Sequence, residues 1–300
     1  MRLRFVLAGL LAGLLAGLAM PVVACAQIRA SEHATMTQRV SATTISMEYD
    51  RPVTRGRTLF GPGGVVKWGE VWTPGANWAT TIDVDRDVTV EGQTLPKGKY
   101  SLWLTPQAAP AAWTLSFSRV AKRFHTRPPG AADEQLHVSL KPEQGMHMEA
   151  LLWYMPVVRP DGVTLRMHWG TTMVPVRIGV ELPKIVSLPA DELPMYVGTY
   201  RVHMTPSGRP AYDAEFTIRE DRGALRIRSV PENVFYEELL MVPVADGRFH
   251  VAYAEVGSFN GRPYTEPGMI FAFHVADGRA RSLEMYGYDD TVVGRGELVK

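Results

Sequence analysis

The sequence contains one cysteine, Cys25, and this scarcity excludes two common ways of stabilising a fold. A single thiol cannot form an intramolecular disulfide, and it cannot supply the several thiolates of a structural zinc site. The folded chain must therefore be stabilised by packing. An excess of charge of one sign is also missing, because 32 basic residues stand against 31 acidic ones. A nearly neutral surface creates no long-range field that gathers nucleic acid, so we expect no nucleic-acid partner.

The common enzyme motifs are missing too. The chain has no G-x-S-x-G elbow, S-x-x-K, H-E-x-x-H, phosphate-binding loop or G-x-G-x-x-G fingerprint. Its eight histidines are scattered, whereas a metal site needs several converging ligands. Adjacent acids such as Asp289 and Asp290 stand at predicted turns, and a raised carboxylate pKa would need burial. We therefore assign no catalytic residue, no metal site and no cofactor.

The first residues have the order of a secretory signal peptide. Arg2 and Arg4 precede an apolar stretch from Phe5 to Met20, which is shorter than the roughly 20 residues of a membrane span. Small residues follow Pro21. We expect a signal peptide over residues 1–26 and a location outside the cytoplasm, periplasmic or secreted.

Cys25 permits two kinds of processing. Val22-Val23-Ala24-Cys25 resembles a bacterial lipobox, in which the cysteine becomes the lipid-modified first residue of a membrane-anchored lipoprotein. Alternatively, Ala24-Cys25-Ala26 is an A-x-A cleavage site that releases a soluble chain beginning at Gln27. Both alternatives stay open, and Cys25 is the lipidation candidate. Contact with a membrane is expected only through such an anchor.

Apolar residues alternate with polar ones over most of the remaining chain, as in Trp113, Leu115 and Phe117. A period of two predicts half-buried antiparallel strands, and Gly, Pro and Asp punctuate the runs. No segment keeps a helical period over three turns. The sequence predicts an all-β protein with a β-sandwich-like domain followed by a lipocalin-like up-and-down β-barrel. The expected boundaries are an N-terminal arm at 27–42, the sandwich at 43–182, a linker at 183–195 and the barrel at 196–300.

The most distinctive part of the chain is residues 49–81, which carry three arginines and three tryptophans. Arginine forks bind carboxylates, phosphates or sulfates, and tryptophan faces stack on sugars or flat rings, so one interpretation is a recognition groove. The alternative is architecture, with tryptophans in the core, Asn77 and Thr80 satisfying backbone groups at a turn, and arginines paired with Asp50 and Glu70. If a groove exists, the ligand-binding candidates are Arg51, Arg57, Trp72, Asn77 and Trp78.

Several motifs resemble the domain-of-unknown-function family 2911 (DUF2911). They are Arg51-Pro52 with Arg55-Gly56-Arg57 and Phe60-Gly61, the run from Gly69 to Thr80, the run from Leu95 to Leu102, Trp113, and Trp169-Gly170-Thr171-Thr172. The resemblance covers roughly residues 30–182. It implies an exported, β-rich protein and no activity. Thr73 stands where the family is expected to carry a basic residue, which weakens an anion site.

The second half is similar to the lipocalin-like modules attached to serine β-lactamase-like proteins. The resemblance depends on Tyr196-Val197-Gly198-Thr199-Tyr200 and on the rhythm of the strands that follow. It implies an accessory or binding element, because no partner catalytic domain is present.

Three functions fit these observations. The favoured one is a non-enzymatic envelope-associated or periplasmic protein that binds a small molecule or an envelope protein. The second is a hydrolase of cell-wall or polysaccharide material, whose carboxylates meet only in the folded state. The third is a structural or assembly lipoprotein, anchored through Cys25, that binds another protein.

Overall fold

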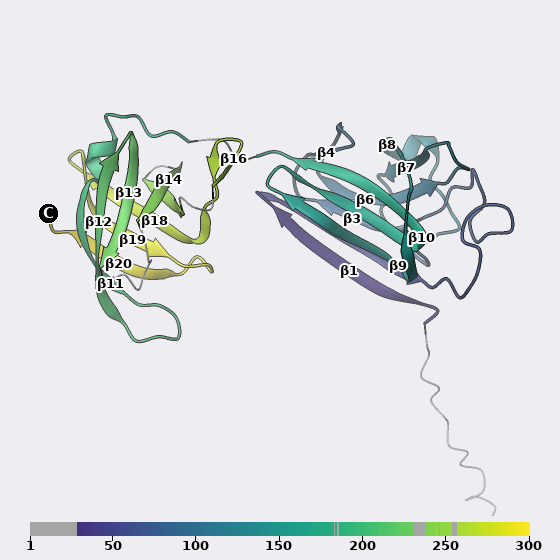
Figure 1. Ribbon diagram of the computed structural model, residues 1–300, viewed down its shortest axis with the longest axis horizontal. Helices are drawn as coiled ribbons and strands as arrows, with labels where there is room; N and C mark the ends of the chain where they lie inside the picture. Colours follow the sequence, from purple (N-terminus) through teal and green to yellow (C-terminus); the bar gives the residue numbers. More distant parts are fainter. Residues whose placement is uncertain (1–28, 183, 185, 231–237, 246, 254–256) are drawn as a thin grey trace, which may run out of the picture. The chain divides into compact units, whose positions relative to one another are not determined.

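The computed structural model describes residues 29–182, 184, 186–230, 238–245, 247–253 and 257–300 (Figure 1). The expected signal peptide and Cys25 lie outside these residues. The chain divides into two compact units, with the boundary between Glu181 and Leu182. Among the described residues, no helix is long and apolar enough to cross a membrane.

The N-terminal unit consists of two antiparallel sheets. Six strands form the larger sheet, in the spatial order β1 (Ser31–Val40), β2 (Thr43–Pro52), β3 (Thr81–Val84), β6 (Gly98–Thr105), β7 (Trp113–Ser118) and β8 (Glu134–Leu140). Four strands form the smaller sheet, in the order β5 (Gln93–Leu95), β4 (Val88–Val90), β10 (Gly162–Val180) and β9 (Glu143–Arg159). A 3-10 turn, η1 (Ala131–Asp133), precedes β8.

The two sheets enclose one apolar core. The alternating residues Ile45 and Met47 of β2 are buried in the same cluster as Leu151 of β9 and Leu165 and Met167 of β10. Because each strand contributes one face, period-two patterning is what such a core requires. The predicted β-sandwich is therefore confirmed.

The structure differs from the sequence prediction at residues 27–42, which were expected to form an arm. Ser31–Val40 instead form β1, which pairs with β2 from Ser31 opposite Pro52 to Val40 opposite Thr43. β1 is an edge strand, so much of it faces solvent and its composition is polar. Only Ala34, Met36 and Val40 pack on the core, and this apolar signal is too weak to predict a strand.

The C-terminal unit is a closed barrel of eight antiparallel strands, as predicted. The strands follow one another around it as β11 (Gly198–Met204), β12 (Tyr212–Asp221), β13 (Ala224–Val230), β14 (Leu239–Ala245), β15 (Arg248–Ala252), β18 (Glu266–Ala276), β19 (Arg279–Tyr286) and β20 (Val292–Leu298). Pairing of β20 with β11 closes it. A small hairpin of β16 (Ser258–Phe259) and β17 (Arg262–Pro263) interrupts the meander.

A 3-10 turn, η2 (Leu193–Tyr196), contributes to the core of the barrel. The ring of Tyr196 meets Phe249 and Phe273 at centroid distances of 4.9 and 5.3 Å. The hydroxyl of Tyr200 donates to the carbonyl of Tyr196 at 3.0 Å. The end of the expected linker, where Leu193 is buried, therefore packs with the barrel.

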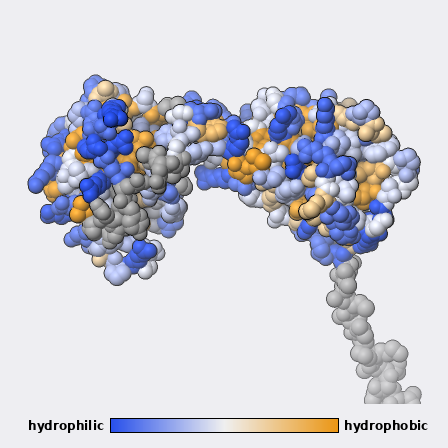
Figure 2. All heavy atoms as spheres, viewed as in Figure 1, coloured by the Kyte–Doolittle hydropathy of each residue, from blue (hydrophilic) through white to orange (hydrophobic). Residues whose placement is uncertain are grey.

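The distribution of hydrophobic residues on the surface is that of units whose apolar side chains are mostly buried. On the face drawn in Figure 2, hydrophobic residues form small areas separated by hydrophilic ones in both units. Isolated exposed apolar residues are ordinary on folded proteins.

Candidate functional site

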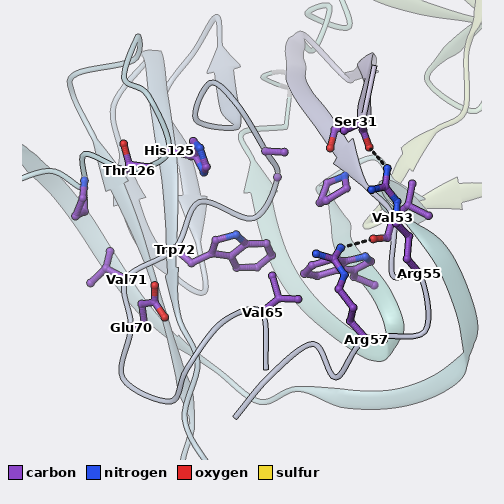
Figure 3. Close-up of a pocket in the computed structure, with 16 residues that line it drawn as sticks. Ser31, Val53, Arg55, Arg57, Val65, Glu70, Val71, Trp72, His125 and Thr126 are labelled. Carbon is purple, nitrogen blue, oxygen red and sulfur yellow. Dashed lines mark hydrogen bonds between the residues drawn. The ribbon is translucent and has the colours of Figure 1, made fainter. Parts of the chain in front are cut away.

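A cavity of about 740 Å³ opens in the N-terminal unit, within the size range of small-molecule sites (Figure 3). We call it the Arg/Trp pocket. Its wall combines the start of β1, the end of β2, two parts of the long loop between β2 and β3, the loop after β7, and one residue of β10. The lining residues are Ala30, Ser31, Pro52, Val53, Arg55, Arg57, Val65, Glu70, Val71, Trp72, Gly75, Ala76, His125, Thr126, Pro128 and Trp169.

Two stacked tryptophans form part of this wall. The rings of Trp72 and Trp169 lie 5.6 Å apart with an interplanar angle of 19°. Phe60 contacts both rings edge-on at 5.9 Å. Backbone bonds between Trp72 and Leu104, at 2.9 and 2.6 Å, tie the Trp72 loop to β6. Trp169 lies on the buried phase of β10 and is 1% exposed, so the stacked pair is held rigidly.

Trp169 also carries an unsatisfied donor. Its indole Nε1 is buried and has no hydrogen-bond partner among the described residues. By contrast, Nε1 of Trp153 donates to the carbonyl of Pro74 at 3.0 Å, and Nε1 of Trp103 donates to Ser101 Oγ at 2.9 Å. Most buried polar atoms have partners, so this wall of the pocket is less completely satisfied than the rest of the core.

Two arginines stand on one side of the pocket. Arg57 donates from Nε to the Thr54 carbonyl at 3.0 Å and from Nη2 to the Val53 carbonyl at 2.6 Å. Arg55 donates from Nη2 to the Ala30 carbonyl at 3.2 Å. Figure 3 shows both guanidinium groups, with the bonds to the Ala30 and Val53 carbonyls dashed. Both side chains are exposed, and among the described residues neither guanidinium forms an ion pair with a carboxylate.

A hydrogen-bond network around the Glu149 carboxylate fixes the loop that carries these arginines. The Glu149 carboxylate accepts from Thr54 Oγ1, from the Arg55 backbone N–H at 2.9 Å and from His147 Nε2 at 2.9 Å. Hydrogen bonding, chiefly from Thr54, lowers the pKa of Glu149 to about 2. Arg55 and Gly56 then turn the chain through left-handed backbone angles, with φ of 50° and 66°. The turn directs Arg55 and Arg57 to the same pocket.

The opposite side of the pocket carries one acid. In Figure 3, Glu70 lies across Trp72 from the two arginines. Its Oε2 accepts from the Lys67 backbone N–H at 3.0 Å. Glu70 is the one carboxylate among the lining residues, whereas glycoside hydrolysis ordinarily uses a pair. In the described part of the chain, no group of three or more His, Cys, Asp or Glu side chains is placed to hold a metal ion.

The structure brings two of the five candidate residues together, because Arg57 and Trp72 both line the pocket. Arg51 lies on β2 and donates from Nε to the Leu151 carbonyl at 3.0 Å, which links β2 to β9. Asn77 occupies a left-handed turn position, φ 58°, and its carbonyl accepts from the backbone of His125 at 2.8 Å. Trp78 is 52% exposed and packs on Phe124 outside the pocket.

The predicted architectural roles are partly observed. Thr80 does satisfy backbone at the turn, donating from Oγ1 to the Pro74 carbonyl at 2.9 Å. The expected pairing of the arginines with Asp50 and Glu70 is wrong, because Asp50 instead contacts His33 at 3.2 Å and Glu70 binds backbone.

Sequence reasoning missed four lining residues that shape the chemistry of the pocket. Arg55 stands in the same run as Arg57, and Trp169 belongs to a motif already noted. Glu70 stands in the second half of the distinctive segment, residues 49–81. His125 had no local signal, because only the fold brings its loop to residues 76–77.

The comparisons with known proteins agree with the first resemblance. Residues 31–178 match the family model described as "Protein of unknown function (DUF2911)", and this span includes all the lining residues except Ala30. No curated protein matches the chain, and no solved structure matches it. The similarity of the second half to lipocalin-like modules stays a prediction.

Proposed function

Through residues 31–178 this chain belongs to the DUF2911 family, and we propose that it is a non-enzymatic ligand-binding protein that works outside the cytoplasm. Its ligand carries an anionic group and a flat or ring-shaped apolar face. The observation that carries the proposal is the presence of two guanidinium groups, with no carboxylate partner in the described part of the chain, beside the stacked tryptophan pair.

The donors of the arginines support an anion as the ligand. A guanidinium has five N–H donors in a fixed fork, and Arg57 uses Nε and Nη2 on backbone carbonyls. These bonds orient the group without neutralising it. A carboxylate, sulfate or phosphate can accept from the remaining donors, while a ring lies against Trp72.

The proposed location depends on the N-terminal sequence. Arg2, Arg4 and the apolar stretch that follows support export through a cleavable signal peptide. If Cys25 is lipidated, the protein is an envelope-associated lipoprotein; otherwise it is soluble in the periplasm or secreted. The mass of the mature chain from its own host distinguishes the two, because it begins either at an acylated Cys25 or at Gln27.

The binding site is tested by calorimetric titration of the mature chain with glucuronate, benzoate and inorganic sulfate. Arg55→Gln and Arg57→Gln are the test variants. Arg86→Gln is the matched control, because Arg86 also donates to a backbone carbonyl, that of Ala42 at 2.7 Å, but lies outside the pocket. A charged hydrogen bond contributes about 1.5–3 kcal/mol, so each pocket variant should weaken binding by roughly tenfold to 100-fold. Equal affinities for Arg57→Gln and Arg86→Gln would refute the proposal.

A further inference from the structure

A pair of exposed aromatic side chains lies next to the Arg/Trp pocket. Trp78 is 52% exposed and Phe124 is 40% exposed. Their rings meet edge to face at a centroid distance of 5.6 Å and an interplanar angle of 88°. The ammonium group of Lys122 lies 5.2 Å from the centroid of Trp78. We call these three residues the aromatic ledge.

The ledge and the pocket share one wall. The His125 ring, which lines the pocket, lies 4.6 Å from the ring of Phe124. The backbone N–H of His125 donates to the Asn77 carbonyl at 2.8 Å, and Trp78 forms a β-bridge with Phe124. Two short chain segments are thus joined by backbone pairing. At one end they line the pocket through Ala76 and His125, and further along they carry the ledge.

This placement distinguishes the ledge from ordinary core packing. The six other tryptophans of the chain are less exposed than Trp78, and four of them are buried. Because backbone bonds fix both segments, a ligand that stacks on Trp78 meets a surface that is already ordered. The charge of Lys122 also matches that of the two pocket arginines.

We propose that the aromatic ledge is a second subsite and that the ligand of this protein is an acidic oligosaccharide. The inference rests on the proposed function of the pocket. One acidic sugar unit lies between the arginines and Trp72, and the next unit extends past His125 and stacks on Trp78. A chain of sugar rings fits both parts, because each unit has an apolar face for an aromatic ring and hydroxyl or acidic groups for the cations. A small aromatic acid would lie between the arginines and Trp72 without reaching Trp78.

The test is a titration of the mature chain with acidic oligosaccharides of one to four units, using galacturonic acid oligomers and sulfated galactose oligomers. Neutral galactose oligomers are the uncharged control. We expect affinity to rise by about tenfold between one unit and two or more, the order of one aromatic stacking contact. Trp78→Ala should remove this rise and leave the affinity for one unit within about twofold. Trp78→Phe should keep most of the rise, because the side chain remains aromatic.

The outcomes separate this inference from the proposed function. If Arg57→Gln abolishes binding but affinity does not depend on length, or if Trp78→Ala keeps the full rise, the ledge is not a subsite. If no acidic saccharide binds while benzoate binds and depends on Arg57, the saccharide assignment fails and the anion pocket stands. If Arg55→Gln and Arg57→Gln leave every affinity unchanged, the pocket proposal itself fails.

Discussion

The unsatisfied indole of Trp169 gives a prediction that compares two substitutions in the same core. Trp153→Phe and Trp169→Phe remove the same atoms from side chains that are 2% and 1% exposed. The loss of ring volume therefore costs a similar amount at both sites. What differs is the indole N–H, which is hydrogen-bonded to the Pro74 carbonyl in Trp153 and, in Trp169, has no partner among the residues that the structure describes.

The magnitude follows from this difference. Trp153→Phe loses a hydrogen bond with a net contribution of about 1 kcal/mol, while the Pro74 carbonyl still accepts from Thr80 Oγ1 at 2.9 Å. Trp169→Phe removes a buried donor whose desolvation costs roughly 1–3 kcal/mol. We therefore expect Trp153→Phe to be the more destabilising variant by about 2–4 kcal/mol. Trp169→Phe should be close to neutral, because the gain offsets the lost packing.

The assay is urea denaturation of the mature chain followed by tryptophan fluorescence. All seven tryptophans lie between Trp68 and Trp169, so the signal reports the sandwich unit separately from the barrel. Trp103→Phe is a second reference, because that indole donates to Ser101. Equal free energies of unfolding for the Trp153 and Trp169 variants would show that the Trp169 N–H is satisfied, and would refute the reasoning.

Two further predictions concern pH. The pKa of Glu149 is lowered from 4.5 to about 2 in the folded chain, so its contribution to stability is complete above pH 4.5 and is lost as the pH falls toward 2. In the Glu149→Gln variant, the free energy of unfolding of the sandwich unit should therefore depend less on pH over that window, as measured by the same fluorescence assay. An unchanged pH dependence in the variant would contradict the prediction. Burial raises the pKa of Tyr200 from 10 to about 12, so the barrel should lose stability as the pH rises from 10 to 12. Tyr200→Phe should remove this alkaline loss. At pH 7 it should cost about 1 kcal/mol of stability, because the hydroxyl donates to the Tyr196 and Ala280 carbonyls. Hydrogen exchange of β11 reports the stability of the barrel, and exchange that the substitution leaves unaltered at pH 7 and at pH 10 would argue against the prediction.

The fold was largely predictable because its strands are buried on one face. In β7, Trp113, Leu115 and Phe117 are all buried while the residues between them are not, and this is the period of two seen in the sequence. Tight turns containing Asp and Gly predicted the meander of the barrel, and Asp277 and Gly278 indeed have positive φ. The first strand was missed because an edge strand needs little apolar surface.

The candidate site was only partly predictable, because strand phase and long-range contacts decide which side chains meet. Arg51 and Arg57 are six residues apart, and both were candidate anion ligands in the sequence. Arg51 is still on β2, where its guanidinium binds the Leu151 carbonyl, whereas the left-handed turn at Arg55 and Gly56 redirects the chain. His125 reaches the pocket through backbone pairing with residue 77, and no local pattern reports a contact over that separation.

Several arginines of this chain are held in one of two ways, by carboxylates or by backbone carbonyls. Acids and bases are almost equal in number, so partners for every guanidinium are available in principle. Arg177 is held by Glu91 at 2.6 Å, and Arg219 is bound by both oxygens of Glu238 at 2.6 Å. Arg55 and Arg57, like Arg51 and Arg86, are instead oriented by backbone carbonyls, which fix the direction of a cation without cancelling its charge, and only Arg55 and Arg57 of these four line the pocket. Two such cations stand beside an ordered aromatic wall, and the proposed ligand supplies a negative charge to them, so the two glutamine variants test the proposed function directly.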